Sequence, residues 1–169
     1  MSTRKLLCNP HGQSIIEITL ITPLLLAALY VAMDFGILFL TAHYTQNAAR
    51  EASRIGAIMP DCAIDATVPC VGTGTVTQSC PGTATVVQEA CNRLPQALTA
   101  ASVKVTLTGV YYPATCMREV KVTASGTYNY GFYRVMALMG FPVSSTTSVD
   151  RSADARYQGQ PVTVTGACA

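Results

Sequence analysis

The chain has 169 residues, enough for one ordinary domain with an anchoring segment but not for two full domains. Half of its residues are hydrophobic and 12% are charged, and the apolar excess is concentrated between Ile15 and Ala42. Beyond residues 1–12, which hold Arg4 and Lys5, nine basic and nine acidic side chains remain. This neutral balance gives no reason to expect nucleic-acid binding, which needs a clustered basic surface.

The apolar excess forms one run over residues 18–40, ITLITPLLLAALYVAMDFGILFL, whose single charge is Asp34. A helix of this length spans about 34 Å, more than the roughly 30 Å of a bilayer's hydrocarbon core. Arg4 and Lys5 precede the run and the next basic residue is Arg50, so the positive-inside tendency places the N-terminus in the cytoplasm. The run is too long for a cleavable signal peptide. The sequence therefore predicts a single membrane-spanning helix that exports everything after it.

Glu17 is unexpected at the start of this run. A carboxylate driven to the middle of a bilayer costs about 2.5–3.5 kcal/mol. Glu17 therefore either stays solvated at headgroup level or pairs with a cation from a neighbouring copy or a partner helix.

The residues around this carboxylate form a motif. Residues 12–17, GQSIIE, resemble a type IV prepilin processing site, at which a membrane-bound prepilin peptidase cuts after the glycine. The resemblance implies a cytoplasmic leader over residues 1–12 and cleavage between Gly12 and Gln13. Glu17 is then the fifth residue of the mature chain, and the resemblance implies that it pairs with the freed amine of Gln13 on an adjacent subunit during assembly. Such a pairing is physically reasonable because either charge alone is costly in an apolar bundle.

Two further motifs narrow the resemblance. The triplet DFG at residues 34–36 lies near the end of the apolar run, and residues 45–54, TQNAAREASR, follow it. Together they resemble the TadE-like proteins of the tight-adherence (Tad) pilus system, in which a D-F-G leads into an N-A-A-R-E-A-A-R helix, and Ser53 is the one departure. The resemblance covers residues 12–58, and TadF-like relatives share much of the pattern.

This resemblance implies a minor pilin or pseudopilin that acts in assembly or priming of a Tad-type type IV pilus for surface adhesion. The partners it implies are the prepilin peptidase, other pilin subunits, Tad assembly proteins and the lipid of a bacterial inner membrane. The exported part is then expected in the periplasm or on the extracellular pilus. The alternative is a single-pass, membrane-anchored periplasmic binding module with a cysteine-rich loop.

Residues 42–58 are predicted to continue the helix beyond the membrane, because they contain many good helix formers and no β-branched run. Apolar and polar side chains fall on opposite faces, with Ala48, Ala52 and Ile55 on one and Asn47, Glu51 and Arg54 on the other. Glu51 and Arg54 are spaced to form an ion pair, and Pro60 ends the helix. The segment is either a packing stalk between subunits or the first helix of the exported domain.

Seven cysteines indicate disulfides formed in an oxidising compartment. Cys8 lies in the leader, and the other six follow the apolar run: Cys62, Cys70, Cys80, Cys91, Cys116 and Cys168. Zinc binding is the competing interpretation, but these six include no C-x2-C pair and neither histidine lies among them. We therefore expect disulfides and neither a metal site nor a cofactor, and the sequence does not choose among the possible pairings.

The first part of the exported chain is predicted to be a loop over residues 61–82, followed by a helix that Thr83 caps. An apolar stripe marks this helix: Val86, Val87, Ala90, Cys91, Leu94 and Leu98. Pro95 is expected to kink it or to split it in two.

Alternation of apolar and polar residues predicts an antiparallel sheet after this helix. The inward-facing residues of its first two strands are Val103, Val105 and Leu107, then Val120, Val122 and Ala124. A turn region over residues 111–116 joins these strands, and Tyr128 and Tyr130 extend the second strand or begin its turn. Residues 143–149 are expected to form a third strand and residues 162–164 a short fourth.

Residues 132–141, FYRVMALMGF, are apolar except for Arg134. They are predicted to form either a short core helix between strands or an amphipathic patch that touches lipid or a partner.

The predicted fold class is therefore α+β, with a long N-terminal transmembrane helix continuing into a small antiparallel-sheet domain with disulfides. Its organisation is a leader over residues 1–12, a transmembrane and stalk helix over residues 13–58, and an exported domain over residues 59–169. The two histidines, His11 and His43, lie outside the exported domain and have no plausible nucleophile partner, so no catalytic residue and no enzyme activity are expected.

Overall fold

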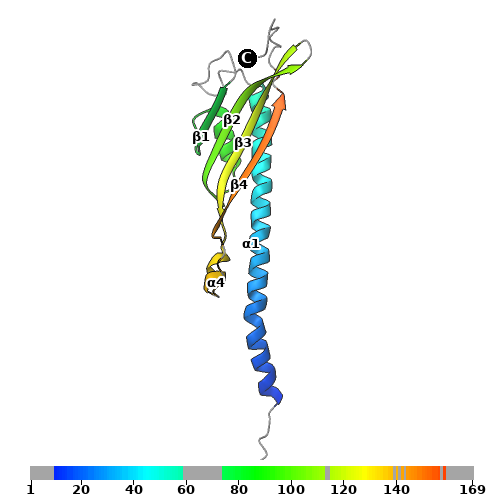
Figure 1. Cartoon of the computed structure of the whole chain (residues 1–169), viewed down its shortest axis with the longest axis vertical. Helices are drawn as coiled ribbons and strands as arrows, with labels where there is room; N and C mark the ends of the chain where they lie inside the picture. Colours follow the sequence, from blue (N-terminus) through cyan, green and yellow to red (C-terminus); the bar gives the residue numbers. More distant parts are fainter. Residues whose placement is uncertain are drawn as a thin grey trace, which may run out of the picture.

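The computed structural model of the chain describes residues 10–58, 74–112, 115–138, 140, 142, 144–156 and 158. One long helix, α1 (Pro10–Ile58), precedes a four-stranded antiparallel sheet. Figure 1 shows the sheet lying along the C-terminal part of α1, while the N-terminal part projects alone beyond it. This is the α+β arrangement that the sequence predicts.

In the projecting part of α1, threonine hydroxyls pair with the helix's own backbone. The hydroxyls of Thr19 and Thr22 donate hydrogen bonds to the carbonyls of Ile15 and Ile18, at 2.8 and 2.7 Å. These bonds satisfy hydroxyl groups that hydrocarbon could not. None of the most apolar 18-residue window of α1 is buried inside the structure, and the helix is long and apolar enough to cross a membrane.

The C-terminal part of α1 lies against the sheet through small side chains. Its buried residues are Thr41, Thr45, Ala48, Ala49, Ala52, Ser53, Gly56 and Ala57. Small residues let the helix backbone approach the strands closely: a Cβ at Gly56 would lie 2.9 Å from a methyl of Val120. The predicted continuation of the helix over residues 42–58 and the pair Glu51–Arg54, at 3.7 Å, are both confirmed.

The sheet has the strand order β1-β2-β3-β4, formed by β1 (Gly74–Ser79), β2 (Leu98–Tyr112), β3 (Thr115–Asn129) and β4 (Thr146–Arg156). Helices α1 and α3 (Thr85–Arg93) pack on one face of it. The predicted inward-facing residues of the two central strands are buried as expected. All of them except Ala124 form one cluster with residues of α1 and α3: Ala52, Val86, Val87, Ala90, Val103, Val105, Leu107, Val120 and Val122. Ala124 packs in a second cluster with Ala49 of α1 and Ala153 of β4.

Strand β1 lies inside the predicted loop over residues 61–82, so that prediction is wrong for residues 74–79. Val76 stands between Thr75 and Thr77 there. The strand is completed by antiparallel pairing with β2, as in Val76 opposite Val105. A strand this short depends on its partner, which lies further along the chain. The predicted turn over residues 111–116 is also too long, because β2 and β3 remain paired out to Tyr112 opposite Thr115.

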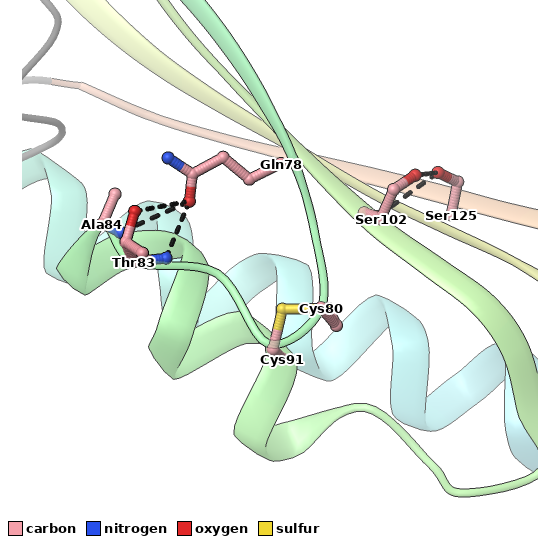
Figure 2. Close-up of a disulfide and its surroundings, with 7 residues drawn as sticks. All are labelled: Gln78, Cys80, Thr83, Ala84, Cys91, Ser102 and Ser125. Carbon is pink, nitrogen blue, oxygen red and sulfur yellow. Dashed lines mark hydrogen bonds between the residues drawn. A yellow bond between two sulfur atoms is a disulfide. The ribbon is translucent and has the colours of Figure 1, made fainter.

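Helix α3 differs from its prediction at both ends. Its N-cap is Ala84, which makes no side-chain capping bond, so the predicted cap by Thr83 is wrong. Instead, the side-chain oxygen of Gln78 on β1 accepts hydrogen bonds from the backbone N–H groups of Thr83 and Ala84, at 2.9 and 3.4 Å (Figure 2). The helix ends at Arg93, and Leu98, which the stripe assigned to it, begins β2 and is buried there.

A disulfide joins Cys80 to Cys91 and ties the end of β1 to α3 (Figure 2). Both cysteines pack against the main hydrophobic cluster. The disulfide closes a loop across a sequence separation of 11, and its stabilisation comes mainly from constraining the unfolded chain. Of the other predicted cysteines, Cys62, Cys70 and Cys168 lie outside the described residues, and the side chain of Cys116 is not described.

Replacing both Cys80 and Cys91 with serine is expected to lower the free energy of unfolding by about 2–3 kcal/mol, because a short closed loop is released in the unfolded state. Urea unfolding of the full-length chain in detergent micelles, followed by circular dichroism, measures this change. Peptide mapping without reduction should recover Cys80 linked to Cys91 in the parent protein, and recovery of either cysteine linked elsewhere contradicts the prediction.

Two segments near the end of the sheet depart from expectation. The last described strand, β4, runs over Thr146–Arg156, later and longer than the predicted strand over residues 143–149. Helix α4 (Tyr133–Leu138) forms within the predicted segment 132–141, but none of its residues is buried, so it is not a core helix. The predicted strand over residues 162–164 lies outside the described residues.

Candidate functional site

The site begins with Asp34, which α1 holds within its exposed apolar stretch. Its neighbours Met33 and Phe35 are 64% and 49% exposed, whereas Asp34 is only 6% exposed. A carboxylate can be buried in such a place only when its charge is matched by hydrogen-bond donors. The segment that leaves β3, residues 128–132, covers Asp34 and supplies these donors.

Both oxygens of the Asp34 carboxylate accept a hydrogen bond. The phenol of Tyr128 donates to Oδ1 at 2.6 Å, and the backbone N–H of Phe132 donates to Oδ2 at 2.9 Å. Hydrogen bonds to an ionised acceptor are short and about twice as strong as neutral ones. They connect positions 94 and 98 residues apart in the chain, so they tie the segment at the end of β3 to α1.

Burial raises the pKa of Tyr128, and the hydrogen bond to Asp34 and the negative charge of that carboxylate raise it further. The phenol is therefore neutral and a hydrogen-bond donor throughout the physiological pH range. This state is the one that the interaction with Asp34 requires.

Aromatic rings surround the buried carboxylate. Phe35 on α1 contacts Tyr130 and Phe132, both with ring centroids 5.8 Å apart. Tyr130 contacts Phe132 at 5.2 Å and meets Tyr128 edge-on at 5.5 Å. Such pairs contribute about 0.5–1.5 kcal/mol each beyond the area that they bury. The rings therefore reinforce the attachment of the 128–132 segment to α1 and shield the hydrogen bonds to Asp34.

Gly131 also lies close to α1. A Cβ there would lie 2.8 Å from the phenol oxygen of Tyr30 and 3.8 Å from Oδ2 of Asp34. A side chain there would therefore require the Tyr30 phenol to shift. By contrast, a Cβ at Gly36 would meet nothing within 4 Å, and the structure does not explain a glycine at that position.

Comparison with known proteins points to the same part of the chain. The family model described as TadE-like protein matches residues 12–54. The chain is TadE-like over this segment. The resemblance that the motifs indicate is confirmed there. No curated protein and no solved structure matches the chain.

The TadE-like segment contains Asp34, but the donors that cover it, Tyr128 and Phe132, lie well beyond its end. Sequence reasoning noted Asp34 only as the one charge in the apolar run and as part of the DFG triplet. A lone carboxylate in an apolar helix needs hydrogen-bond donors from elsewhere in the chain. The cluster of aromatic residues at positions 128–133, which includes tyrosines, is the sequence feature that could have indicated where those donors lie.

The predicted processing and assembly residues lie at the other end of the TadE-like segment. Gly12 and Gln13 are within the first turns of α1, and their side chains are not described. Glu17 is exposed on α1, 17 residues before Asp34, which corresponds to about 25 Å of helix. The two carboxylates are therefore separate features of one helix and do not form a single site.

Within the described residues, no group of three or more His, Cys, Asp or Glu side chains is placed to hold a metal ion. One acidic pair crosses two strands, Glu119 on β3 and Asp154 on β4. The hydrogen bond that the Glu119 carboxyl donates to Asp154, together with burial and the negative charge of Asp154, raises the pKa of Glu119. In the strand register, Glu119 lies opposite Arg156 and Asp154 lies opposite Lys121. The two acidic residues therefore belong to a group of charged side chains on β3 and β4.

Proposed function

We propose that this chain is a minor pilin or pseudopilin that acts in assembly or priming of a Tad-type type IV pilus for surface adhesion. In this proposal, a prepilin peptidase removes residues 1–12, and α1 crosses the bacterial inner membrane once with its N-terminus in the cytoplasm. The sheet domain lies in the periplasm or on the extracellular pilus. The role is structural and involves no enzymatic step.

The observation that carries the proposal is the apolar surface of α1. Large exposed side chains coat its projecting part: Ile15, Ile16, Ile18, Leu20, Ile21, Leu24, Leu25, Leu26, Leu29, Tyr30 and Met33. An apolar surface on all sides of a helix is stable only among lipids or other helices. A pilin needs both environments, first the membrane and then a bundle of subunits. The TadE-like segment coincides with this surface.

The assembly step in this proposal uses Glu17. Its carboxylate is exposed at the start of the apolar coat, so the amine of a processed neighbour can reach it. Cleavage after Gly12 creates that amine on Gln13, and the two opposite charges stabilise each other in the apolar bundle. Other pilin subunits and Tad assembly proteins are the partners that this surface would accept.

The proposal predicts that the mature chain begins at Gln13. Intact-mass spectrometry of the protein purified from membranes of a piliated host should show loss of residues 1–12. The variant Gly12→Val places a branched side chain at the scissile bond and should remain uncut. A parent protein that keeps its original N-terminus in a piliated host contradicts the proposal and supports a permanently anchored binding module.

A further inference from the structure

Helix α4 exposes apolar side chains that would be unfavourable in contact with water. Leu138 is 90% exposed and Val135 is 39% exposed, and no residue of α4 is buried. The basic residue Arg134 is exposed on the same helix. These three side chains are unexplained by the packing of the sheet domain.

The attachment of α4 places it beside the apolar part of α1. Phe132, the residue before α4, donates its N–H to Asp34 and packs its ring on Phe35. Gly131 approaches Tyr30, one turn closer to the N-terminus of α1. Figure 1 shows α4 beyond the end of the sheet, next to the part of α1 that carries no strands.

The exposed apolar side chains of α1 continue past Asp34 toward the sheet. Phe39 is 80% exposed, and Ile37 and Leu40 are about half exposed. Leu40 is six residues beyond Asp34, which is about 9 Å along the helix. A bilayer that covers the side chains up to Leu40 must therefore also cover the level at which α4 is attached.

We propose that α4 is inserted into the lipid leaflet on the sheet side of the membrane, as a second and shallower contact beside the span. Val135 and Leu138 lie among the acyl chains, and the guanidinium of Arg134 extends to the lipid phosphates. The buried bonds to Asp34 hold α4 at this depth. The inference rests on the proposed membrane span of α1 and is independent of a role in pilus assembly.

Lipid, rather than a second copy of the chain, is the partner that best fits the exposed side chains of α4. Two observations favour it, the continuity of its apolar surface with that of α1 and the positive charge of Arg134. The exposed residues of α4 continue the lipid-facing coat of the adjoining helix, and Arg134 matches an anionic headgroup. Insertion also explains why the segment before α4 buries Asp34, since a carboxylate at this depth needs donors from its own chain.

The chain contains no tryptophan, so one introduced tryptophan reports its own environment. Leu138→Trp is the test variant, Phe39→Trp marks the span, and Gln88→Trp marks an exposed position on α3, away from the proposed membrane contact. Each full-length variant is reconstituted at a high lipid-to-protein ratio in phosphatidylethanolamine–phosphatidylglycerol vesicles, with and without brominated acyl chains. Mapping of the Cys80–Cys91 disulfide verifies that each variant folds.

The expected result is a blue-shifted emission for Leu138→Trp and a quenching by brominated lipid similar to that of Phe39→Trp, with Gln88→Trp unquenched. If Phe39→Trp is quenched and Leu138→Trp is not, the inference about α4 is wrong while the span stands. A blue-shifted Leu138→Trp that escapes quenching indicates a contact with protein and also overturns the inference. Absence of quenching at Phe39→Trp overturns the span itself, and the insertion of α4 with it.

Discussion

Replacing Asp34 with alanine is expected to weaken the attachment of the 128–132 segment to α1 by about 3–4 kcal/mol. The effect is large because two donors buried with the carboxylate, the phenol of Tyr128 and the N–H of Phe132, lose their acceptor together. Hydrogen–deuterium exchange of the full-length chain in detergent micelles measures this loss. The protection of the Phe132 amide should fall by about 100- to 1000-fold.

Two further variants separate this interaction from general destabilisation. Asp150→Ala removes an exposed aspartate on β4 and should leave the Phe132 amide protected. In a Tyr128→Phe background, Asp34→Ala should have a smaller effect than in the parent, because one of the two bonds is already absent. Unchanged protection of Phe132 in Asp34→Ala would show that the carboxylate does not hold the sheet domain to α1.

Replacing Glu17 with alanine is expected to abolish incorporation of the chain into pili while the exported domain still folds. The proposed assembly step pairs this carboxylate with the amine of Gln13 on a neighbour, and without it a positive charge is left unmatched in an apolar bundle. Electron microscopy of the cells and immunoblots of the sheared pilus fraction measure assembly. Recovery of the Cys80–Cys91 disulfide from the membrane fraction verifies folding.

Glu51→Ala is the matched control for Glu17→Ala, because it removes a glutamate from the same helix outside the apolar run. Glu51 pairs with Arg54 at 3.7 Å on the surface, and such a pair contributes only a few tenths of a kcal/mol. This variant should assemble like the parent. Normal piliation with Glu17→Ala would remove the assembly role and favour a membrane-anchored binding module.

Helix α1 and the two central strands were predictable because local periodicity identifies them. The apolar run and the helix formers after it account for α1 up to Ile58, and alternation identified the buried residues of β2 and β3. The motifs that resemble TadE-like proteins lie in the segment that the TadE-like family model matches, residues 12–54. Each of these features depends on residues that are neighbours in the sequence.

Elements that depend on distant partners were missed or misplaced. Strand β1 resembles a loop until β2 pairs with it, and Leu98 fits a helical stripe until β2 places it in the sheet. Helix α3 begins without a cap from its own side chains because Gln78 on β1 accepts the backbone hydrogen bonds. In each case a tertiary contact outweighs a local preference.

The amino-acid sequence by itself determined the long apolar helix, its continuation toward the sheet and the inward faces of the central strands, because composition and short periods encode them. Only the tertiary structure decided how Asp34 is buried and where α4 lies. The reason is that the donors to Asp34 are 94 and 98 residues away, and no local pattern reports a contact over that distance.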